Sequence, residues 1–506
     1  MSTPLSALAA ALGDAERRGP DVAVDDVTHD SRRAGPGVLF CAIPGEVTDG
    51  HDHAPAAVAA GTPALLVERW LDLDVAQVRV PSVRAAAGPA AARVHGHPAE
   101  RLAVVGVTGT NGKTTTAYLV EAAAAAGGLG TGVIGTIETR VHGVPEPGVR
   151  TTPESTDLQR LLATMHARGV DVVAMEVSSH GLALHRVDGT RFAVGVFTNL
   201  TQDHLDFHGT MEAYLAAKQR LFAGDLAERA VVWVSEDGIG ARVAAEAAVP
   251  VTTVGEVDGV DHRLVDVETG LDGVRGVLRG PDGDLPLSTR LLGRHNLANA
   301  ACAVLAAVAA GVAPDAAVAG VAACPGVPGR LEQVTRPDGP TGAGPRVFVD
   351  YAHTPDALER VVGELRAALP PAGRLHVVVG CGGDRDRGKR PLMGAVAARA
   401  DLAVLTSDNP RSEDPDAILA AVRAGAEEAV AAGAPAEVVV QADRRAAIRT
   451  AVARAAEADV VLVAGKGHET GQEAAGVVRP FDDRVEAAAA LAERAAGTLP
   501  TDRTPA

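Results

Sequence analysis

Residues 102–115 read LAVVGVTGTNGKTT, an apolar run that leads directly into a loop of glycines and threonines. An alanine-rich, helix-prone segment follows and extends to about Ala126. This order predicts a buried strand, a phosphate-binding loop and a helix, because glycines let backbone N–H groups approach phosphate oxygens and the helix N-terminus adds positive potential. In such a loop Lys113 reaches the terminal phosphates and Thr114 can bind Mg²⁺.

The loop departs from the general phosphate-loop pattern at one position. That pattern has a glycine six residues before the lysine, where this chain has Val107. A plain glycine turn between a strand and a helix is therefore the alternative interpretation. The Gly-Lys-Thr ending, with a strand before it and a helix after it, favours phosphate binding.

From about Ala103 onward, short valine-rich runs alternate with longer alanine-rich runs, which indicates βαβ units and parallel sheets. We therefore expect an α/β fold. A chain of 506 residues is too long for one core, since a domain averages about 150 residues. Turn-rich segments near Pro98 and between 324 and 345 predict three domains and a short tail. These are a small α/β domain at 1–98, a central parallel-sheet domain at 99–335, a Rossmann-like domain at 336–498 and a disordered tail at 499–506.

The composition disfavours several classes of protein. A formal net charge of -17 disfavours a nucleic-acid or anionic-membrane binder, because phosphate groups attract a basic surface. The four cysteines have no paired spacing, so neither a disulfide framework nor a zinc ribbon is indicated. The most apolar helix candidate, at 297–312, is shorter than a membrane span, and no signal peptide is recognisable. We expect a cytoplasmic monomer with no membrane insertion.

Two further strand ends carry candidate metal ligands. A strand at 170–175 ends at Glu176, which could hold the same Mg²⁺ as Thr114, although a lone glutamate there is more often a solvated cap. A strand at 192–198 leads into a polar segment in which His204 could bind a second metal through a neutral imidazole. The alternative is that His204 only caps the next helix.

Lys218 stands at an unusual position for a cation. If residues 211–222 form a helix, Lys218 shares its face with Leu215, Leu221 and Phe222. A bare ammonium on an apolar face costs free energy. The lysine could extend to water, pair with an acid, or lose its charge by chemical modification, and the residues alone favour the first.

Three strands of the third predicted domain, at 375–379, 403–406 and 460–463, each end in a polar loop. Ligands of open α/β sheets bind at the carboxyl ends of strands, so we expect these loops to form one pocket. Arg411 can bind a carboxylate and Glu469 can accept from an ammonium, which suits a zwitterion. A surface turn at Asn409-Pro410 is the alternative. A dinucleotide fingerprint is excluded, because Arg385 stands where its third glycine would be.

These motifs resemble those of the Mur ligase family, since GTNGKT at 109–114, Glu176, His204 and KQRLF at 218–222 occur in the family's order. The resemblance covers nearly the whole chain. It implies ATP as co-substrate, two Mg²⁺ ions, and a Lys218 carbamylated by CO₂ whose new carboxylate helps hold the second ion. The implied catalytic residues are Lys113, Glu176, His204 and Lys218, and the implied metal ligands are Thr114, Glu176, His204 and Lys218. The implied ATP-binding residues are Gly109, Thr110, Asn111, Gly112, Lys113, Thr114, Thr115, Asn296, Arg330 and Asp350.

The resemblance also implies the other two substrates. The segment THDSR at 28–32 is similar to the family's UDP-sugar-binding domain, and Asp-Asn-Pro-Arg at 408–411 is typical of members that use meso-diaminopimelate. The residues implied for the UDP-N-acetylmuramoyl-dipeptide are His29, Ser31, Glu46, Val47, Thr48, Thr151, Thr152, Ser178 and Arg186. At Leu184 some members carry glutamine, so the resemblance does not carry over one expected hydrogen bond to this chain. The residues implied for diaminopimelate are Arg385, Asp408, Asn409, Pro410, Arg411, Gly465 and Glu469.

The resemblance therefore predicts an enzyme that activates the D-glutamate γ-carboxylate of the nucleotide-sugar dipeptide as an acyl phosphate and joins it to meso-diaminopimelate, in peptidoglycan precursor synthesis. Two alternatives stay within the ligases, a lysine-adding enzyme and a folylpolyglutamate synthetase, and Arg411 and the uridine-like first domain argue against them. A third alternative is a phosphate-loop regulatory ATPase, which would hydrolyse ATP without an amino-acid substrate.

Overall fold

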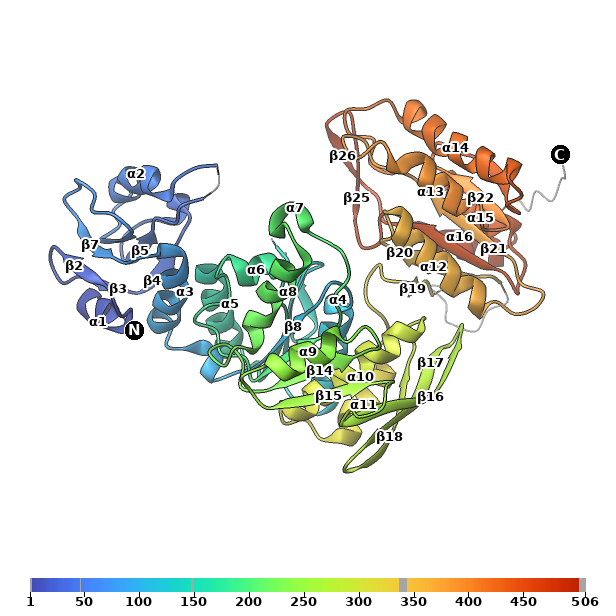
Figure 1. Cartoon of the computed structure of the whole chain (residues 1–506). Helices are drawn as coiled ribbons and strands as arrows, with labels where there is room; N and C mark the ends of the chain where they lie inside the picture. The colour runs from blue at the N-terminus through green and yellow to red at the C-terminus, as the bar shows by residue number, and fades with distance from the viewer. Residues whose placement is uncertain (1, 46, 147–149, 336–343, 500–506) are drawn as a thin grey trace. The chain divides into compact units, whose positions relative to one another are not determined.

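The computed structural model describes residues 2–45, 47–146, 150–335 and 344–499. By contacts the chain divides into two compact units (Figure 1). One comprises Met1–Val267, Gly276–Ser288 and His295–Cys324; the other comprises Glu268–Arg275, Thr289–Arg294 and Pro325–Ala506. The expected α/β class is confirmed, whereas the division into three domains stays a prediction. Of the predicted tail, only Leu499 is among the described residues.

A five-stranded sheet near the N-terminus has the order β2-β7-β6-β5-β4. Its strands are β2 (Glu16–Arg18), β4 (Asp26–Thr28), β5 (Val38–Cys41), β6 (Ala64–Val67) and β7 (Ala76–Arg79). Strands β4 to β7 pair in parallel and β2 runs antiparallel to β7. Alternate residues bury opposite faces: Leu39 and Leu66 pack with α1 (Leu5–Ala11) and α3 (Val83–Val94), while Phe40 and Leu65 pack with α2 (Ala54–Ala59). A short pair, β1 (Thr3–Pro4) and β3 (Ala23–Val24), lies outside this sheet.

The largest sheet has eleven strands in the order β11-β10-β9-β12-β8-β13-β14-β15-β16-β17-β18. The parallel strands are β9 (Thr131–Ile134), β12 (Val172–Glu176), β8 (Ala103–Thr108), β13 (Val194–Phe197), β14 (Ala230–Val234), β15 (Val251–Gly255) and β16 (His262–Gly270). The remaining strands are β10 (Thr139–Val141), β11 (Val144–Glu146), β17 (Gly273–Gly280) and β18 (Gly283–Thr289). The sequence analysis predicted strands 102–107, 170–175 and 192–198 but not β16 to β18.

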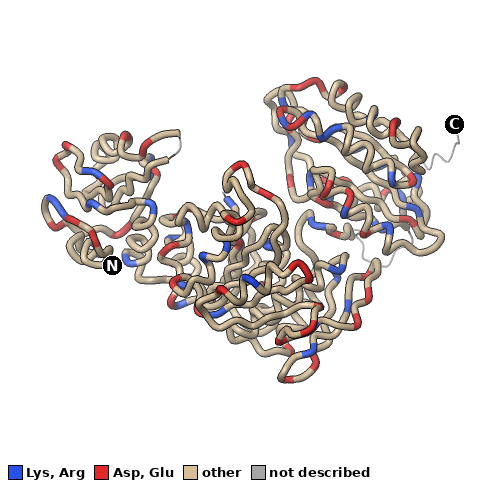
Figure 2. Tube along the Cα trace, in the orientation of Figure 1, with Lys and Arg blue, Asp and Glu red and all other residues tan. Residues whose placement is uncertain are grey.

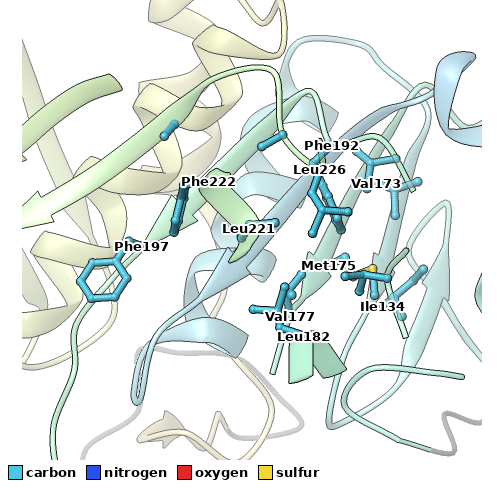
Figure 3. Close-up of a cluster of buried hydrophobic side chains, with 14 of the residues drawn as sticks. Ile134, Val173, Met175, Val177, Leu182, Phe192, Phe197, Leu221, Phe222 and Leu226 are labelled. Atoms are coloured by element: carbon cyan, nitrogen blue, oxygen red, sulfur yellow. The ribbon is translucent and has the colours of Figure 1, made fainter. Parts of the chain in front are cut away.

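Strand β8 lies at the middle of this sheet between β12 and β13, so the segments that follow all three strands meet at one edge. The helices of this part are α4 (Lys113–Ala126), α5 (Ser155–Ala167), α6 (Ser179–Ala183), α7 (Leu205–His208), α8 (Met211–Gln219), α9 (Ile239–Glu246), α10 (Arg294–Ala309) and α11 (Pro314–Ala323). Figure 3 shows Met175, Val177, Leu182 and Phe192 in one buried cluster, which anchors α6 and the strands beneath the edge.

The predicted helix at 211–222 ends as an α-helix at Gln219 and continues as a 3₁₀ turn over Arg220–Phe222. Thr210 caps its N-terminus, because its side chain accepts from the N–H of Ala213. The face predicted to be apolar is buried, including Leu215, Leu221 and Phe222.

A six-stranded sheet forms the core of the C-terminal unit, in the order β19-β20-β24-β21-β22-β23. Its strands are β19 (Glu332–Gln333), β20 (Arg346–Asp350), β24 (Val460–Ala464), β21 (Leu375–Val379), β22 (Leu402–Leu405) and β23 (Glu437–Val440), all parallel except β19. Val377 and Val379 face the helices α12 (Pro355–Ala368), α13 (Lys389–Ala397) and α14 (Pro415–Ala431), while Val378 faces α15 (Arg444–Arg454) and α16 (Asp483–Ala495) (Figure 1). A hairpin, β25 (Gly471–Ala474) and β26 (Val477–Pro480), stands apart from the sheet.

Basic and acidic residues are interspersed along the tube in Figure 2, so the net negative charge is not gathered in one segment. None of the helices in the described parts of the chain is long and apolar enough to cross a membrane.

Gly88 tests how tightly α3 is packed. A Cβ at this position would lie 1.9 Å from the carbonyl oxygen of Asp188, so we expect Gly88→Ala to lower the free energy of unfolding by about 1–3 kcal/mol. The matched control is Gly363→Ala in α12, where a Cβ meets open space and should raise stability by about 0.5–1 kcal/mol. Urea unfolding measures both, and equal midpoints for Gly88→Ala and wild type would contradict the packing argument.

Candidate functional site

The loop between β8 and α4 has no space for side chains at two of its glycines. A Cβ at Gly109 would lie 2.0 Å from the hydroxyl of Thr198, and one at Gly112 would lie 2.4 Å from Oδ1 of Asn299. Gly112 also has φ +87 and caps α4, a conformation that glycine adopts without strain. The loop can therefore bring its backbone N–H groups close to a phosphate.

Residues that follow β13 hold this loop in shape. The hydroxyl of Thr198 donates to Asn111 O at 2.6 Å, Oδ1 of Asn199 accepts from Asn111 N at 2.9 Å, and Asn199 O accepts from the N–H of Thr110 at 2.9 Å. The hydroxyl of Thr110 lies 3.1 Å from that of Tyr214. The sequence analysis did not assign Thr198, Asn199 or Tyr214 a role, because their proximity to the loop depends on the order of the strands.

Two lysines point their ammonium groups at the same carbonyl. Nζ of Lys113 donates to Gly109 O at 2.9 Å and to Thr110 O at 2.8 Å, and Nζ of Lys218 donates to Gly109 O at 2.8 Å. Lys218 is 1% exposed, and its Nζ lies 4.4 Å from the centre of the Tyr214 ring. The interpretation that Lys218 extends to water is therefore wrong, because the side chain turns inward to the phosphate loop.

The environment of Lys218 favours its neutral form. Burial, and then the positive charge of Lys113, lower the pKa of Lys218 to about 6. A neutral amine is a nucleophile, whereas an ammonium is not. A lowered pKa is what the modification hypothesis requires, and the modification itself stays a prediction.

Glu176 is buried at the end of β12, where it pairs in register with Val107 of β8. Its Oε1 accepts from the N–H of Thr136 at 2.8 Å, and its Oε2 accepts from the hydroxyl of Thr136 at 3.0 Å. Both partners are uncharged donors. A buried carboxylate with neutral partners beside a phosphate loop fits Mg²⁺, which prefers oxygen ligands, and Thr114 on the adjoining helix is also buried. Thr136 was not predicted.

His204 is partly exposed and has φ 52 at the start of α7. Its ring centre is 4.8 Å from that of His180 and 6.1 Å from that of Tyr214, so it shares Tyr214 with Lys218. Among the described residues, no three His, Cys, Asp or Glu side chains are grouped as a ready metal site. The predicted ligand set instead combines a threonine, Glu176, His204 and Lys218, and it stays a prediction.

The residues predicted for the dipeptide gather beside Glu176. The hydroxyl of Thr152 donates to Glu176 O at 2.9 Å and accepts from the N–H of Ser178 at 3.0 Å, while Thr151 contacts Thr136 through hydroxyls 3.0 Å apart. Ser178 caps α6 by accepting from Gly181 N. The hydroxyl groups of Thr136, Thr151, Thr152 and Ser178 therefore lie together near the C-terminal end of β12. Of these four residues, only Thr136 was not predicted.

Arg186 is held next to this group by Glu154, with an ion pair of 2.9 Å. Glu154 also pairs with Arg150 at 2.8 Å and Arg84 at 3.5 Å, so three cations share one carboxylate. Burial lowers the pKa of Arg186. The surplus of positive charge suits an anionic substrate.

A pocket of about 550 Å³ adjoins this cluster. His29 contributes to its wall, and its Nδ1 lies 2.9 Å from the hydroxyl of Thr156. Of the described residues predicted for the nucleotide sugar, Ser31, Val47 and Thr48 do not line this pocket, and Val47 is 95% exposed. Glu46 lies outside the described residues.

In the C-terminal unit, the loops after β21, β22 and β24 converge. A Cβ at Gly465 would lie 3.4 Å from Oδ2 of Asp408 and 3.7 Å from Gly380 O. One at Gly382 would lie 3.0 Å from Nη1 of Arg411 and 3.9 Å from Cγ of Arg385. The structure therefore brings together residues predicted for the amino acid, with cationic and anionic side chains on neighbouring loops.

The hairpin β25–β26 fixes the loop that carries Arg411. Arg411 has φ 52, its N–H donates to Glu473 O at 3.1 Å, and its carbonyl accepts from the N–H of Ala475 at 2.7 Å. Gln472 donates to Asp408 O at 2.7 Å. The guanidinium of Arg411 donates to Gly383 O at 2.8 Å. The hairpin was not predicted, because its short strands carry no apolar alternation.

Two fully buried cations lie next to these loops, and neither was predicted to have a role. Lys466 contacts Asp408, Asn409 and Glu469. Arg444 binds Asp483 through two bonds of 2.7 Å and donates to Ala464 O at 2.9 Å. Ala464 precedes Gly465 in the chain, so the Arg444–Asp483 pair anchors the base of the loop after β24.

The three remaining residues predicted for ATP, Asn296, Arg330 and Asp350, are divided between the two units. Asn296 is buried on α10, and its Oδ1 accepts from Asn299, whose own Oδ1 faces Gly112. Asp350 closes β20, and its two oxygens accept from the N–H groups of Leu331 and Ala352, each at 2.7 Å. Arg330 lies over the ring of Tyr351 at 5.1 Å. Thr354 caps the following helix, α12, by accepting from the N–H of Ala357.

Known proteins with similar sequences agree in one family description. Models of the Mur ligase family catalytic domain, the Mur ligase middle domain and the Mur ligase glutamate ligase domain match residues 23–108, 107–307 and 329–467. The chain is 47% identical over 498 residues to a UDP-N-acetylmuramoyl-L-alanyl-D-glutamate--2,6-diaminopimelate ligase of Streptomyces avermitilis, over 96% of this chain and 95% of that protein. A ligase of the same name from Streptomyces coelicolor is 49% identical over 498 residues, with the same coverage.

A solved structure of a ligase with that name superposes with a TM-score of 0.73 at 32% identity, over 98% of this chain and 99% of that one. The similarity extends over all three family segments. It therefore includes the loop 109–115, the polar loops of the C-terminal unit and the N-terminal sheet.

Removing the cation of the buried pair leaves Asp483 without compensation, so we expect Arg444→Met to lower the free energy of unfolding by about 3–5 kcal/mol. Arg445→Met is the control on the same helix, since it breaks only a partly exposed pair with Glu486 and should change stability by less than about 1 kcal/mol. Removing both partners in Arg444→Met/Asp483→Leu should recover part of the loss. Urea unfolding checks all three, and equal stability of the two single variants would overturn the anchoring role.

Proposed function

The chain belongs to the Mur ligase family, and we propose that it joins meso-diaminopimelate to the D-glutamate of UDP-N-acetylmuramoyl-L-alanyl-D-glutamate at the expense of ATP. It is an acid–amino-acid ligase of peptidoglycan synthesis. Relatives of that name, aligned over nearly the full length of the chain, support the activity. The observation that carries the choice of amino acid is that Asn409, two residues before Arg411, donates to Glu469, so that a cation and an anion belong to neighbouring loops.

The work is divided among three domains, at 1–98, 99–335 and 336–498. The first binds the UDP end of the nucleotide sugar, the second binds ATP and the dipeptide, and the third binds the incoming amino acid. The enzyme acts as a cytoplasmic monomer on small molecules, without nucleic acid or membrane insertion. Its product serves cell-wall growth, and through it cell shape and division.

ATP binds with its phosphates on the loop 109–115. The backbone N–H groups there face the phosphate oxygens, and Lys113 exchanges its contacts with Gly109 O and Thr110 O for the terminal phosphates. Asn296 faces the adenine. Asp350 holds the ribose with the lone pairs that Leu331 and Ala352 leave unused, and Arg330 contacts the phosphates.

Thr114, Glu176, His204 and carbamylated Lys218 would hold two Mg²⁺ ions. When bound, the ions neutralise charge on the phosphates and the reacting carboxylate. Carbamylation forms a bond between Nζ of Lys218 and the carbon of CO₂, and the amine releases one proton to solvent. The product is a carboxylate, so a buried cation becomes an oxygen ligand.

The reaction has two steps. A γ-carboxylate oxygen of D-glutamate attacks the γ-phosphorus of ATP, the bond to the β-phosphate oxygen breaks, and ADP leaves. A neutral amine of diaminopimelate then attacks the acyl carbon, a proton leaves the nitrogen, and the bond to phosphate breaks. Lys113 stabilises the negative charge that develops on the phosphoryl oxygens and the tetrahedral carbon.

Charged groups of the two substrates bind side chains of the opposite charge. Arg186 exchanges Glu154 for a carboxylate of the dipeptide, beside the hydroxyls of Thr151, Thr152 and Ser178. His29, Ser31 and the loop 46–48 bind the uridine end. Arg385, Asp408, Asn409, Pro410 and Gly465 shape the amino-acid pocket, in which Arg411 binds the distal carboxylate and Glu469 the distal ammonium.

The activity is tested by ADP release from ATP with the UDP-muramoyl-dipeptide and either meso-diaminopimelate or L-lysine, which lacks the distal carboxylate. We expect release to require both the dipeptide and diaminopimelate, and Arg411→Ala to lower kcat/KM for diaminopimelate about 100-fold while leaving that for lysine nearly unchanged. If the wild type releases ADP at equal rates with lysine and with diaminopimelate, Arg411 does not recognise the distal carboxylate. ATP turnover without any amino acid would favour the regulatory ATPase.

Carbamylation of Lys218 is tested by ¹³C NMR in ¹³C-bicarbonate. Because the pKa of Lys218 is about 6, its amine is mostly neutral at pH 8, and we expect a carbamate signal in the wild type that disappears in Lys218→Ala. Lys389→Ala is the control and should keep the signal. Activity lost in Lys218→Ala should return in part with acetate or formate. A carbamate signal that persists in Lys218→Ala would place the modification elsewhere.

A further inference from the structure

Lys466 is fully buried between Gly465 and Gly467 in the loop that follows β24. An ammonium group has three N–H donors, and here it has three acceptors: Asn409 Oδ1 at 3.2 Å, Glu469 Oε2 at 3.1 Å and Asp408 Oδ1 at 3.5 Å. With all donors engaged, Lys466 has none to offer a ligand. Its effect on the pocket must pass through the three residues that it contacts.

Those contacts determine which way the Asn409 amide faces. Oδ1 of Asn409 accepts both from Lys466 and from the N–H of Glu473, the latter at 2.9 Å. Its Nδ2 therefore turns to Glu469 and donates to Oε2 at 2.9 Å. A closed ring of hydrogen bonds joins Lys466, Asn409 and Glu469. Loss of the lysine removes one of the two donors that keep the amide from rotating.

The same ring leaves one carboxylate oxygen for a ligand. Both side-chain contacts of Glu469 in the described structure fall on Oε2, and the side chain is 35% exposed, which leaves Oε1 for a ligand. The net charge of this cluster follows from its members. Asp408 and Glu469 carry two negative charges and Lys466 carries one positive charge. The cluster therefore retains one negative charge, which matches one ammonium group.

We infer that Lys466 is a positioning residue that holds Asn409 and Glu469 in place and sets the pocket to accept a single ammonium, the distal one of the incoming amino acid. This inference rests on the proposed function. It assigns the lysine a part in selecting the substrate, beyond neutralising buried acids.

The test is the pattern of KM values in Lys466→Met, measured for each of the three substrates. We expect KM for diaminopimelate to rise at least 20-fold, with KM for ATP and for the UDP-muramoyl-dipeptide within twofold of wild type and kcat within fivefold. Arg449→Met is the control, because it breaks a partly exposed ion pair with Glu493 in the same unit and should leave all three KM values unchanged. A parallel rise of all three in Lys466→Met, or no rise, would overturn the inference.

An isosteric variant covers the case in which Lys466→Met does not fold. In Asp408→Asn the remaining charges of Glu469 and Lys466 cancel, so KM for diaminopimelate should also rise at least 20-fold. An unchanged KM would show that the charge of the cluster does not select the ligand.

Chemical rescue separates charge from packing. Lys466→Ala leaves a space that fits propylammonium, which should lower KM for diaminopimelate at least fivefold, whereas 1-propanol of similar size should not. Equal effects of the two molecules would reduce Lys466 to a space-filling role. If the wild type releases no ADP with diaminopimelate, the proposed function itself fails. If the wild type does release ADP but Lys466→Met has an unchanged KM for diaminopimelate, only this inference is overturned.

Discussion

Parallel pairing of buried strands forces the polar segments of a chain to one edge of each sheet, because every crossover starts where a strand ends. The central sheet places the phosphate loop after β8 between Glu176 after β12 and Asn199 after β13. The C-terminal sheet repeats the arrangement with the loops after β21, β22 and β24. Two groups of loops with chemically different side chains thus arise from one rule of topology.

The two buried lysines, Lys466 and Lys218, differ in the partners that surround their amino groups. Lys466 lies among Asp408, Asn409 and Glu469, so its charge is compensated within the fold. Lys218 is held by the carbonyl of Gly109 and the ring of Tyr214, with Lys113 nearby, and these surroundings lower its pKa. The first lysine has anionic partners, whereas the second has none within hydrogen-bond distance among the described residues. This contrast, more than the presence of a lysine on an apolar face, distinguishes a structural cation from a reactive amine.

The features that could be predicted from the sequence are those that depend on residues close together in the chain. The strand, glycine loop and helix around Lys113 form one uninterrupted segment, and the apolar face around Lys218 follows from helical spacing. The partners of these residues could not be predicted in the same way. Thr136 meets Glu176 because β9 adjoins β12, and Arg444 meets Asp483 because α15 and α16 share a face of the sheet. Such contacts depend on strand order, which local spacing does not encode.

The docking of the hairpin β25–β26 on Arg411 bears on the engineering of this scaffold. Arg411 keeps a left-handed backbone because its N–H and carbonyl are both bonded to the hairpin, and Glu473 reaches Asn409 as well. Exchanging the arginine alone would leave the loop in the shape that the hairpin imposes. A redesign of this loop therefore has to exchange residues 408–411 and 471–480 together, because the hairpin holds the loop backbone in its shape.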